Sequence, residues 1–218
     1  MTFPAVLRRA ALGPRQWIVA GGLALACLLL VGLGGWAWWS FYQSRGQAEL
    51  ELVLARLRGA QGSPAPAETR ADTVKALESV IQRYPRLRAL PHAAYQLGNL
   101  HYQAGAHEEA RKAYQLALAT GARGTLAMLC RLGIGYTWEV QGDHAEALAA
   151  FDTGLQGSTP REFLYEEFLL GVARTQQLLG QRDRARETYQ RLLKELPESR
   201  RAEDVRARLA SLEGPARP

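Results

Sequence analysis

One stretch of the sequence, residues 16–44, carries no charged side chain. Within it, residues 17–39 form a 23-residue run made mostly of Leu, Ala, Gly, Val and Trp. As a helix that rises 1.5 Å per residue, this run covers about 35 Å, slightly more than the roughly 30 Å hydrocarbon core of a bilayer. Trp17 marks one end and Trp39 the other, as is typical of residues at the two membrane interfaces. The run therefore predicts a transmembrane helix over residues 17–43.

The apolar run has three other possible interpretations. The aromatic residues at both edges favour a spanning helix over a buried helix of a soluble domain. A cleaved signal peptide has a shorter apolar core and a small-residue cleavage site, whereas this run ends in bulky aromatic residues. The residues before Cys27 are faintly similar to a lipoprotein processing site, but Leu28 and further apolar residues follow at once. We interpret Cys27 as an ordinary membrane-helix residue.

The basic residues around the run predict its orientation. Three arginines and no acidic residue precede it, whereas Arg45 stands alone after it, before Glu49. The positive-inside rule therefore places residues 1–16, a short basic N-terminus, in the cytoplasm. Everything after Ser44 is expected on the far side, which is the periplasm in a Gram-negative bacterium.

Helical periodicity continues beyond the membrane. Leucines at three- and four-residue spacing predict a helix over residues 47–59 that continues the membrane helix outward. Gly and Pro over residues 62–67 predict a break, and a second helix is expected over residues 68–84, ended by Pro85. We interpret residues 44–90 as a helical stem and a degenerate leading hairpin. No useful stretch alternates with period two, so no sheet is expected.

Beyond Pro91 one pattern occurs three times: a glycine, an alanine five residues later and an aromatic residue four after that. Its copies are Gly105, Ala110 and Tyr114; Gly142, Ala147 and Phe151; and Gly180, Ala185 and Tyr189. The glycines lie 37 and 38 residues apart. A small residue stands seven positions before each of them: Gly98, Gly135 and Ala173.

This pattern resembles the tetratricopeptide repeat, a pair of antiparallel helices. The resemblance implies an all-α fold, with three repeats over residues 91–198 forming a helical-hairpin solenoid after the single transmembrane helix. A capping helix and tail over residues 199–218 would close it. The glycines would end the first helix of each pair, Gly98 with Ala110 would form a small pair at the first crossing, and the aromatic residues would pack between neighbours. The spacing exceeds the usual 34 residues, so longer helices or connections are expected near residues 121–125 and 157–161.

No residue pattern predicts catalysis. His107 and His144 occupy the same position in two repeats, which favours turn packing over metal binding. Cys130 lies on an apolar helix face and is expected to be buried and inert, and its one potential partner, Cys27, is expected in the membrane. A phosphate-binding glycine loop and a serine nucleophile elbow are both missing from the sequence. We therefore expect no enzyme activity, cofactor, metal site or small-molecule substrate.

The net charge of +6 first suggests a nucleic-acid partner. Three of the 27 basic residues precede the apolar run. The rest of the chain therefore contains 24 basic and 21 acidic residues, a net charge of +3. These charges alternate along the predicted helices as they do on solvated faces. Nucleic-acid binding is therefore not expected.

Protein binding remains, because the first helices of stacked hairpins line a concave surface. By helical phase, eight residues are predicted to face this groove: Tyr95, Asn99, Tyr102, Leu132, Tyr136, Glu139, Leu170 and Arg174. The first three form an i, i+4, i+7 stripe suited to gripping a peptide or helix through aromatic area and amide hydrogen bonds. Each of the eight could instead pack against a neighbouring helix.

The layout of the chain resembles the ancillary SecYEG translocon subunit (YfgM-like) family of bacterial inner membranes. Residues 187–199, and residues 81–85 with 95–98, are also similar to outer-membrane assembly lipoproteins and Tol-Pal-associated repeat proteins. Those proteins lack a retained membrane helix, so the run from Trp17 to Trp39 favours the first family. This resemblance implies a single-pass protein of the bacterial inner (cytoplasmic) membrane whose C-terminal domain is periplasmic.

We therefore expect a membrane-anchored adaptor that binds partner proteins or peptides through its repeat groove. The resemblance implies a role in protein export or cell-envelope biogenesis, with the translocon or periplasmic chaperones as partners. The alternative is a structural subunit of an outer-membrane assembly or Tol-Pal-type envelope complex. In that case the convex face and the membrane helix would make the contacts.

Overall fold

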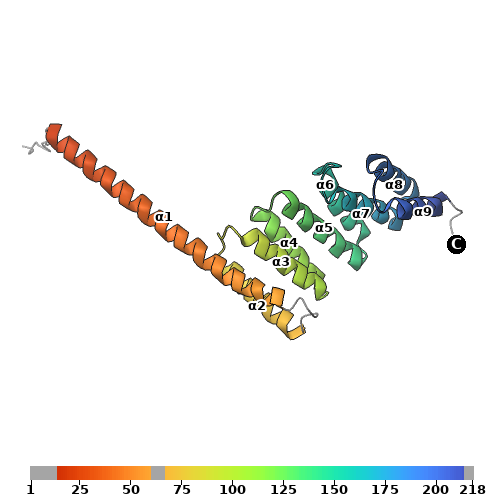
Figure 1. Cartoon of the computed structure of the whole chain (residues 1–218), viewed down its shortest axis with the longest axis horizontal. Coiled ribbons are helices and arrows are strands. Elements are labelled where there is room, and N and C mark those ends of the chain that lie inside the picture. Colours follow the sequence, from red (N-terminus) through yellow and green to blue (C-terminus); the bar gives the residue numbers. More distant parts are fainter. Residues whose placement is uncertain (1–13, 60–66, 214–218) are drawn as a thin grey trace, which may run out of the picture. The chain divides into compact units, whose positions relative to one another are not determined.

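A computed structural model of the chain describes residues 14–59 and 67–213, and its regular elements are helices (Figure 1). They are α1 (Pro14–Gly59), α2 (Ala67–Arg83), α3 (Leu90–Gln103), α4 (His107–Ala119), α5 (Gly124–Gln141), α6 (His144–Gln156), α7 (Tyr165–Leu178), α8 (Arg182–Glu195) and α9 (Ala202–Glu213). No strand occurs in these two ranges, which confirms the predicted all-α fold. The basic N-terminus up to residue 13, residues 62–66 of the predicted break and the tail from residue 214 lie outside the described residues.

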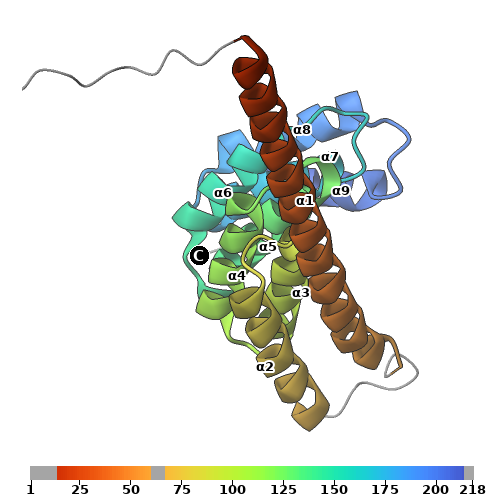
Figure 2. The same cartoon turned by 90° about the vertical axis from the view of Figure 1, so that its left-hand side faces the viewer.

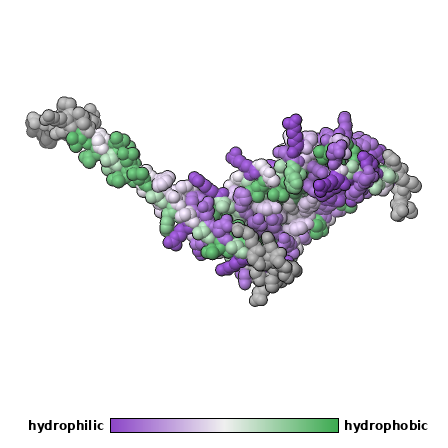
Figure 3. Space-filling model, viewed as in Figure 1, coloured by the Kyte–Doolittle hydropathy of each residue, from purple (hydrophilic) through white to green (hydrophobic). Residues whose placement is uncertain are grey.

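The chain divides into two units, one up to Arg45 and one from Gly46 onward. In the first unit α1 exposes its apolar side chains, and Figure 3 shows this part of the helix as a hydrophobic surface. Trp38 and Trp39 both stack on Tyr42, with ring centroids 5.9 and 5.7 Å away. Among the described residues, one helix is long and apolar enough to cross a membrane, with a candidate span of Gly21–Leu57. The predicted long apolar helix is therefore present.

The second unit is a series of helical hairpins (Figures 1 and 2). Helix α3 packs on α4, α5 on α6 and α7 on α8, and each hairpin contacts the next. The first helices of successive hairpins also touch, α3 with α5 and α5 with α7. Helix α9 packs on α8 at the end of the series. This arrangement confirms the predicted helical-hairpin solenoid with a final helix packed on its last repeat.

The end of α1 that belongs to the second unit contacts the end of α2. The Glu49 carboxylate accepts hydrogen bonds from Arg83 at 2.9 Å and from the Tyr84 hydroxyl at 2.7 Å. A Cβ added at Gly46 would lie 2.8 Å from Leu87. The end of α1 therefore contacts the last residue of α2, Arg83, and the residues that follow it.

Each hairpin turns at a glycine in the left-handed conformation. The φ angles are 76° at Gly105, 83° at Gly142 and 73° at Gly180. A side chain would strain the backbone in this conformation, which is why glycine ends so many helices. A longer connection between hairpins, residues 157–164, lies where the sequence predicts one. At the other predicted place the connection is short and the extra length belongs to α5, a helix of 18 residues.

The repeat aromatic residues fill the space between neighbouring hairpins. A Cβ added at Gly98 of the same hairpin, or at Gly133 of the next, would lie 2.5 Å from the Tyr114 ring. The Phe151 ring likewise lies between Gly135 and Gly171, where an added Cβ would lie 2.4 and 2.8 Å away. The prediction that these rings pack between neighbours is confirmed.

One feature of the crossing was not predicted. The atoms nearest to a Cβ added at Gly98 belong to the Tyr114 ring, so the glycine makes room for a ring. The sequence also left Gly133 and Gly171 unassigned. Both stand nine residues before a turn glycine, and this equal offset was the signal that could have found them.

Cys130 is expected to resist thiol reagents in the native protein. Its side chain is 0% exposed, and burial raises the pKa of the thiol to about 11. At pH 8 about one molecule in a thousand then carries the reactive thiolate, against about a quarter at the ordinary pKa. Ellman's reagent should therefore label the full chain carrying Cys27→Ser only after denaturation. A Gln115→Cys change on the exposed face of α4 is the fast-reacting control, and equal native rates at the two positions would contradict the expectation.

Candidate functional site

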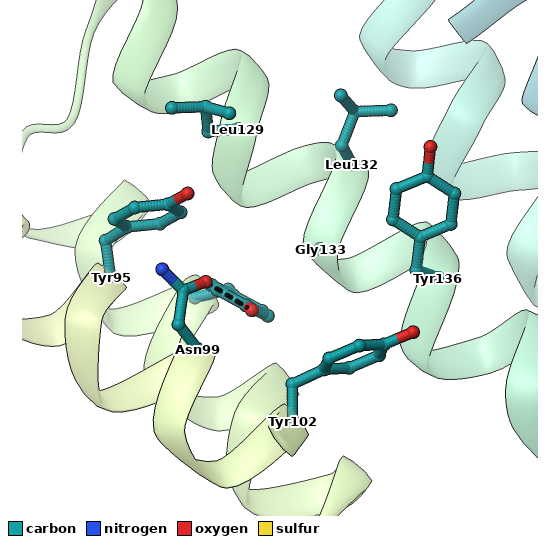
Figure 4. Close-up of a pocket in the computed structure, with 8 residues that line it drawn as sticks. Tyr95, Asn99, Tyr102, Leu129, Leu132, Gly133 and Tyr136 are labelled. Carbon is teal, nitrogen blue, oxygen red and sulfur yellow. Dashed lines mark hydrogen bonds between the residues drawn. The ribbon is translucent and has the colours of Figure 1, made fainter. Parts of the chain in front are cut away.

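A hollow of about 200 Å³ opens between the first helices of two repeats, α3 and α5 (Figure 4). We call it the tyrosine pocket, and its lining residues are Tyr95, Asn99, Tyr102, Tyr114, Leu129, Leu132, Gly133 and Tyr136. Five of the eight predicted groove residues meet here: Tyr95, Asn99, Tyr102, Leu132 and Tyr136. All of the lining residues are uncharged.

Each of the three predicted groove tyrosines contacts a second aromatic ring. The pairs are Tyr95 with Tyr114 at 5.9 Å between ring centroids, Tyr102 with His107 at 5.5 Å, and Tyr136 with Phe151 at 5.4 Å. The second ring comes from α4 or α6, the second helices of the hairpins. The three tyrosine rings are therefore held in place by contacts within the protein, an arrangement that would lower the entropy lost if a ligand bound here.

The amide of Asn99 supplies hydrogen-bond donors to the pocket. The Tyr114 hydroxyl donates to Asn99 Oδ1 at 2.8 Å, and burial holds the pKa of Tyr114 well above its usual value, so this donor stays protonated. Figure 4 shows the Asn99 nitrogen directed away from that bond, toward Tyr95. The two N–H groups of the amide take no part in the bond to Tyr114 and suit an acceptor such as a carbonyl oxygen.

Beside the pocket, side chains of α5, α7 and the segment before α9 form what we call the polar band: Glu139, Glu167, Arg174 and Arg201. Arg174 donates two hydrogen bonds to Glu139, one of them from Nη2 at 2.6 Å. Arg201 contacts Glu167 at 2.5 Å. Two of the predicted groove residues, Glu139 and Arg174, therefore bind each other, and the two carboxylates and two guanidinium groups balance in charge.

Tyr136 joins the polar band to the pocket. Its hydroxyl donates to Glu167 at 3.2 Å, and the Arg174 guanidinium lies 5.8 Å from the centroid of its ring. Burial, followed by the nearby Glu167 charge, raises the pKa of Tyr136 to about 12. The phenol therefore stays protonated at neutral pH and keeps donating to the carboxylate.

A second hollow of about 220 Å³ lies beyond the polar band, lined by Leu170, Arg174, Tyr189, Arg201, Asp204 and Arg208. It contains Leu170, the last of the predicted groove residues, together with Arg174. Five of the eight predicted residues thus form an uncharged group at α3 and α5, and the other three, Glu139, Leu170 and Arg174, lie among the charged side chains near α7 and α9. The residues of α9 were missed because α9 lies outside the repeat register. Leu129 and Gly133 could have been found, since they extend the stripe of Leu132 and Tyr136 at i, i+3, i+4 and i+7.

The two repeat histidines lie at the hairpin turns. The Nδ1 atoms of His107 and His144 are buried without a hydrogen-bond partner, and the His107 ring packs on Tyr102. Within the described part of the chain, no three His, Cys, Asp or Glu side chains lie together so that they could hold a metal ion. His107 therefore contributes to the site by bracing a groove tyrosine.

Solved structures with the same fold were found. A tetratricopeptide repeat protein from Parabacteroides merdae has a TM-score of 0.62 and 16% identity, and the similarity covers 77% of this chain and 61% of that one. A kinesin-light-chain candidate of Podosopora anserina with nearly identical TPR-like repeats has a TM-score of 0.59 and 15% identity, covering 78% of this chain and 86% of that one. The MamA protein has a TM-score of 0.50 and 16% identity, covering 82% of this chain and 97% of that one. At these identities the likeness concerns the fold alone.

Sequence comparison adds family membership. No curated protein matches the chain. The sequence profile of the tetratricopeptide repeat-like domain matches residues 16–214, nearly the full length. With the hairpins, turn glycines and inter-repeat rings described above, this match shows that the chain belongs to the tetratricopeptide repeat-like domain family.

Proposed function

We propose that this protein is a membrane-anchored adaptor that binds partner proteins through the tyrosine pocket. The observation that carries the proposal is that uncharged groove residues from two repeats line one hollow. Their tyrosine rings pack on aromatic rings of the second helices, α4 and α6. Repeats of this kind generally bind proteins and act as scaffolds without catalysis. Anchoring by the apolar part of α1 would confine the pocket near a bilayer and raise its effective concentration for partners there.

The proposal divides the chain into five parts. Residues 1–16 are a cytoplasmic N-terminus and residues 17–43 the membrane anchor. Residues 44–90 are a stem with a leading hairpin, residues 91–198 the three repeats, and residues 199–218 a capping helix and tail. The arginines before the anchor support this orientation, because basic residues are retained on the cytoplasmic side.

The proposed place of action is the periplasmic side of a bacterial inner membrane, in protein export or envelope biogenesis near the translocon. Its support is the layout of a basic N-terminus, one apolar helix and a repeat unit, which resembles the ancillary translocon subunit family. The partners proposed on this basis are translocon subunits or periplasmic chaperones.

The adaptor function is tested by crosslinking in native membranes, followed by identification of the captured proteins. Changing Tyr95→Ala together with Tyr102→Ala removes two braced rings from the pocket and should reduce capture at least about tenfold, as expected for aromatic residues at the centre of an interface. A matched control is Gln115→Ala with Gln190→Ala on the exposed faces of α4 and α8, which should leave capture unchanged.

Helical circular dichroism of both double variants establishes that the repeat unit stays folded. Capture that survives the tyrosine changes but is lost on replacement of the membrane helix would contradict the adaptor function. That result would favour the structural subunit of an outer-membrane assembly or Tol-Pal-type complex, with contacts through the convex face and the membrane helix.

A further inference from the structure

We infer that the tyrosine pocket takes one neutral aromatic side chain of a partner segment, and that Asn99 binds a backbone carbonyl oxygen of the same segment. This inference rests on the proposed adaptor function and names the chemistry of its partner.

The size of the pocket suits an aromatic ring. An apolar protein cavity of about 150 Å³ binds benzene, and the tyrosine pocket measures about 200 Å³. Its walls combine tyrosine rings with Leu129 and Leu132. Rings in such a site gain from edge-to-face and offset contacts in addition to the burial of apolar area. An aromatic anchor therefore fills this space better than a small or branched side chain.

The charges of the site select a neutral side chain. A charged group that entered the tyrosine pocket would lose its hydration among uncharged lining residues, which is costly without a counter-ion. In the neighbouring polar band, Arg174 is engaged with Glu139 and Arg201 with Glu167. The tyrosine pocket and the polar band thus match a partner segment without net charge where it contacts them. The affinity for such a segment should depend little on salt concentration.

The position of Asn99 adds a contact to the main chain of the partner. On α3 it lies between Tyr95 and Tyr102 on the same face of the helix, one turn from each. Because Oδ1 accepts from the Tyr114 hydroxyl, the amide is fixed with its N–H groups available as donors. A segment that lies along α3 with its ring in the pocket would bring a carbonyl oxygen to these donors. A carboxylate is a poorer match, since it would bring an unpaired charge into the pocket.

The test uses the full chain in lipid nanodiscs and a library of random peptides displayed on phage. Selected peptides are expected to share Trp, Tyr or Phe with neutral neighbours, and their affinity should change less than about threefold between about 0.05 and 0.5 M salt. Asn99→Asp keeps an acceptor for Tyr114 but replaces the amide donors with a charged acceptor. This change should lower the affinity for the selected peptides at least about tenfold. Gln115→Glu makes the same chemical change on the exposed face of α4 and should have no effect.

Several outcomes overturn the inference. Selection of Asp- and Glu-rich or Lys- and Arg-rich peptides with strongly salt-dependent affinity would assign recognition to the charged groups near α7 and α9 instead. Undiminished binding to Asn99→Asp, or no selected peptide at all, would also refute the pocket chemistry. Failure of the adaptor function has a different signature. In that case native-membrane capture survives Tyr95→Ala with Tyr102→Ala, while the selected peptides still lose affinity for Asn99→Asp.

Discussion

Replacing Phe151 with alanine should lower the free energy of unfolding of the repeat unit by about 3–5 kcal/mol. The Phe151 side chain is 0% exposed and packs between Gly135 of its own hairpin and Gly171 of the next. Glycine has no side chain with which to fill the space that the ring would leave, so the cavity would stay open or the hairpins would have to move together. The change therefore removes apolar burial and a contact between repeats at the same time.

Phe163 offers a matched control for this variant. It stands on the connection between α6 and α7 and is 87% exposed, so Phe163→Ala should change the free energy of unfolding by less than about 0.5 kcal/mol. Urea denaturation of the full chain, followed by helical circular dichroism, measures both values. Similar losses for the two variants would contradict the packing described for Phe151.

A double-mutant cycle tests the contact itself. Gly135→Ala alone should cost about 1–3 kcal/mol, because the added Cβ meets the Phe151 ring and Gly171 blocks the ring on its other side. In the Phe151→Ala background the same methyl group enters the vacated space, so its cost should fall or change sign. Additive losses in the free energy of unfolding would show that the Phe151 ring does not press against Gly135.

The parts of the structure that the sequence predicted are those set by local rules. The turn glycines follow from a backbone conformation that side chains disfavour, and each acts within its own hairpin. Helical phase likewise fixes which side chains share a face of one helix, so the sequence predicts that Tyr95, Asn99 and Tyr102 lie on one face of α3. The structure places them in one pocket.

Contacts between repeats were harder to predict. Gly133 is required by a ring that belongs to the preceding hairpin, and the signal for it comes only from comparison with Gly171 at the same offset in the next repeat. Helical phase also placed Glu139 and Arg174 toward the groove, but it could not show that residues 35 positions apart bind each other.

Arg111 is a further residue whose role no sequence pattern indicates. It is buried, lies 3.5 Å from the centroid of the Trp138 ring and donates a hydrogen bond to Gln141, so a charged residue helps to join α4 to α5. The face of an indole ring stabilises a guanidinium group by itself, so no acidic residue nearby in the sequence indicates this contact. Its burial depends on two side chains of the next repeat, which only the fold brings into reach.

Two arginines in the apolar part of α1 should move the protein from the membrane to the soluble or aggregated fraction. In Leu28→Arg with Leu30→Arg, each change places a charge near the middle of the proposed anchor, at a cost of roughly 3 kcal/mol per arginine for insertion. The combined cost of about 6 kcal/mol lowers the insertion equilibrium by roughly four orders of magnitude. Carbonate extraction of membranes from cells producing the variant measures the shift.

Leu178→Arg with Val140→Arg is the matched control, because it makes the same kind of change at exposed aliphatic residues outside the candidate span Gly21–Leu57. Leu28 and Leu30 are 70% and 69% exposed, and Val140 and Leu178 are 59% and 51% exposed. If all four side chains faced water, both double variants would be tolerated, since arginine at an exposed position costs little. Loss of membrane association by the first variant alone would show that the exposed surface of α1 meets lipid, whereas equal partitioning would contradict the proposed anchor.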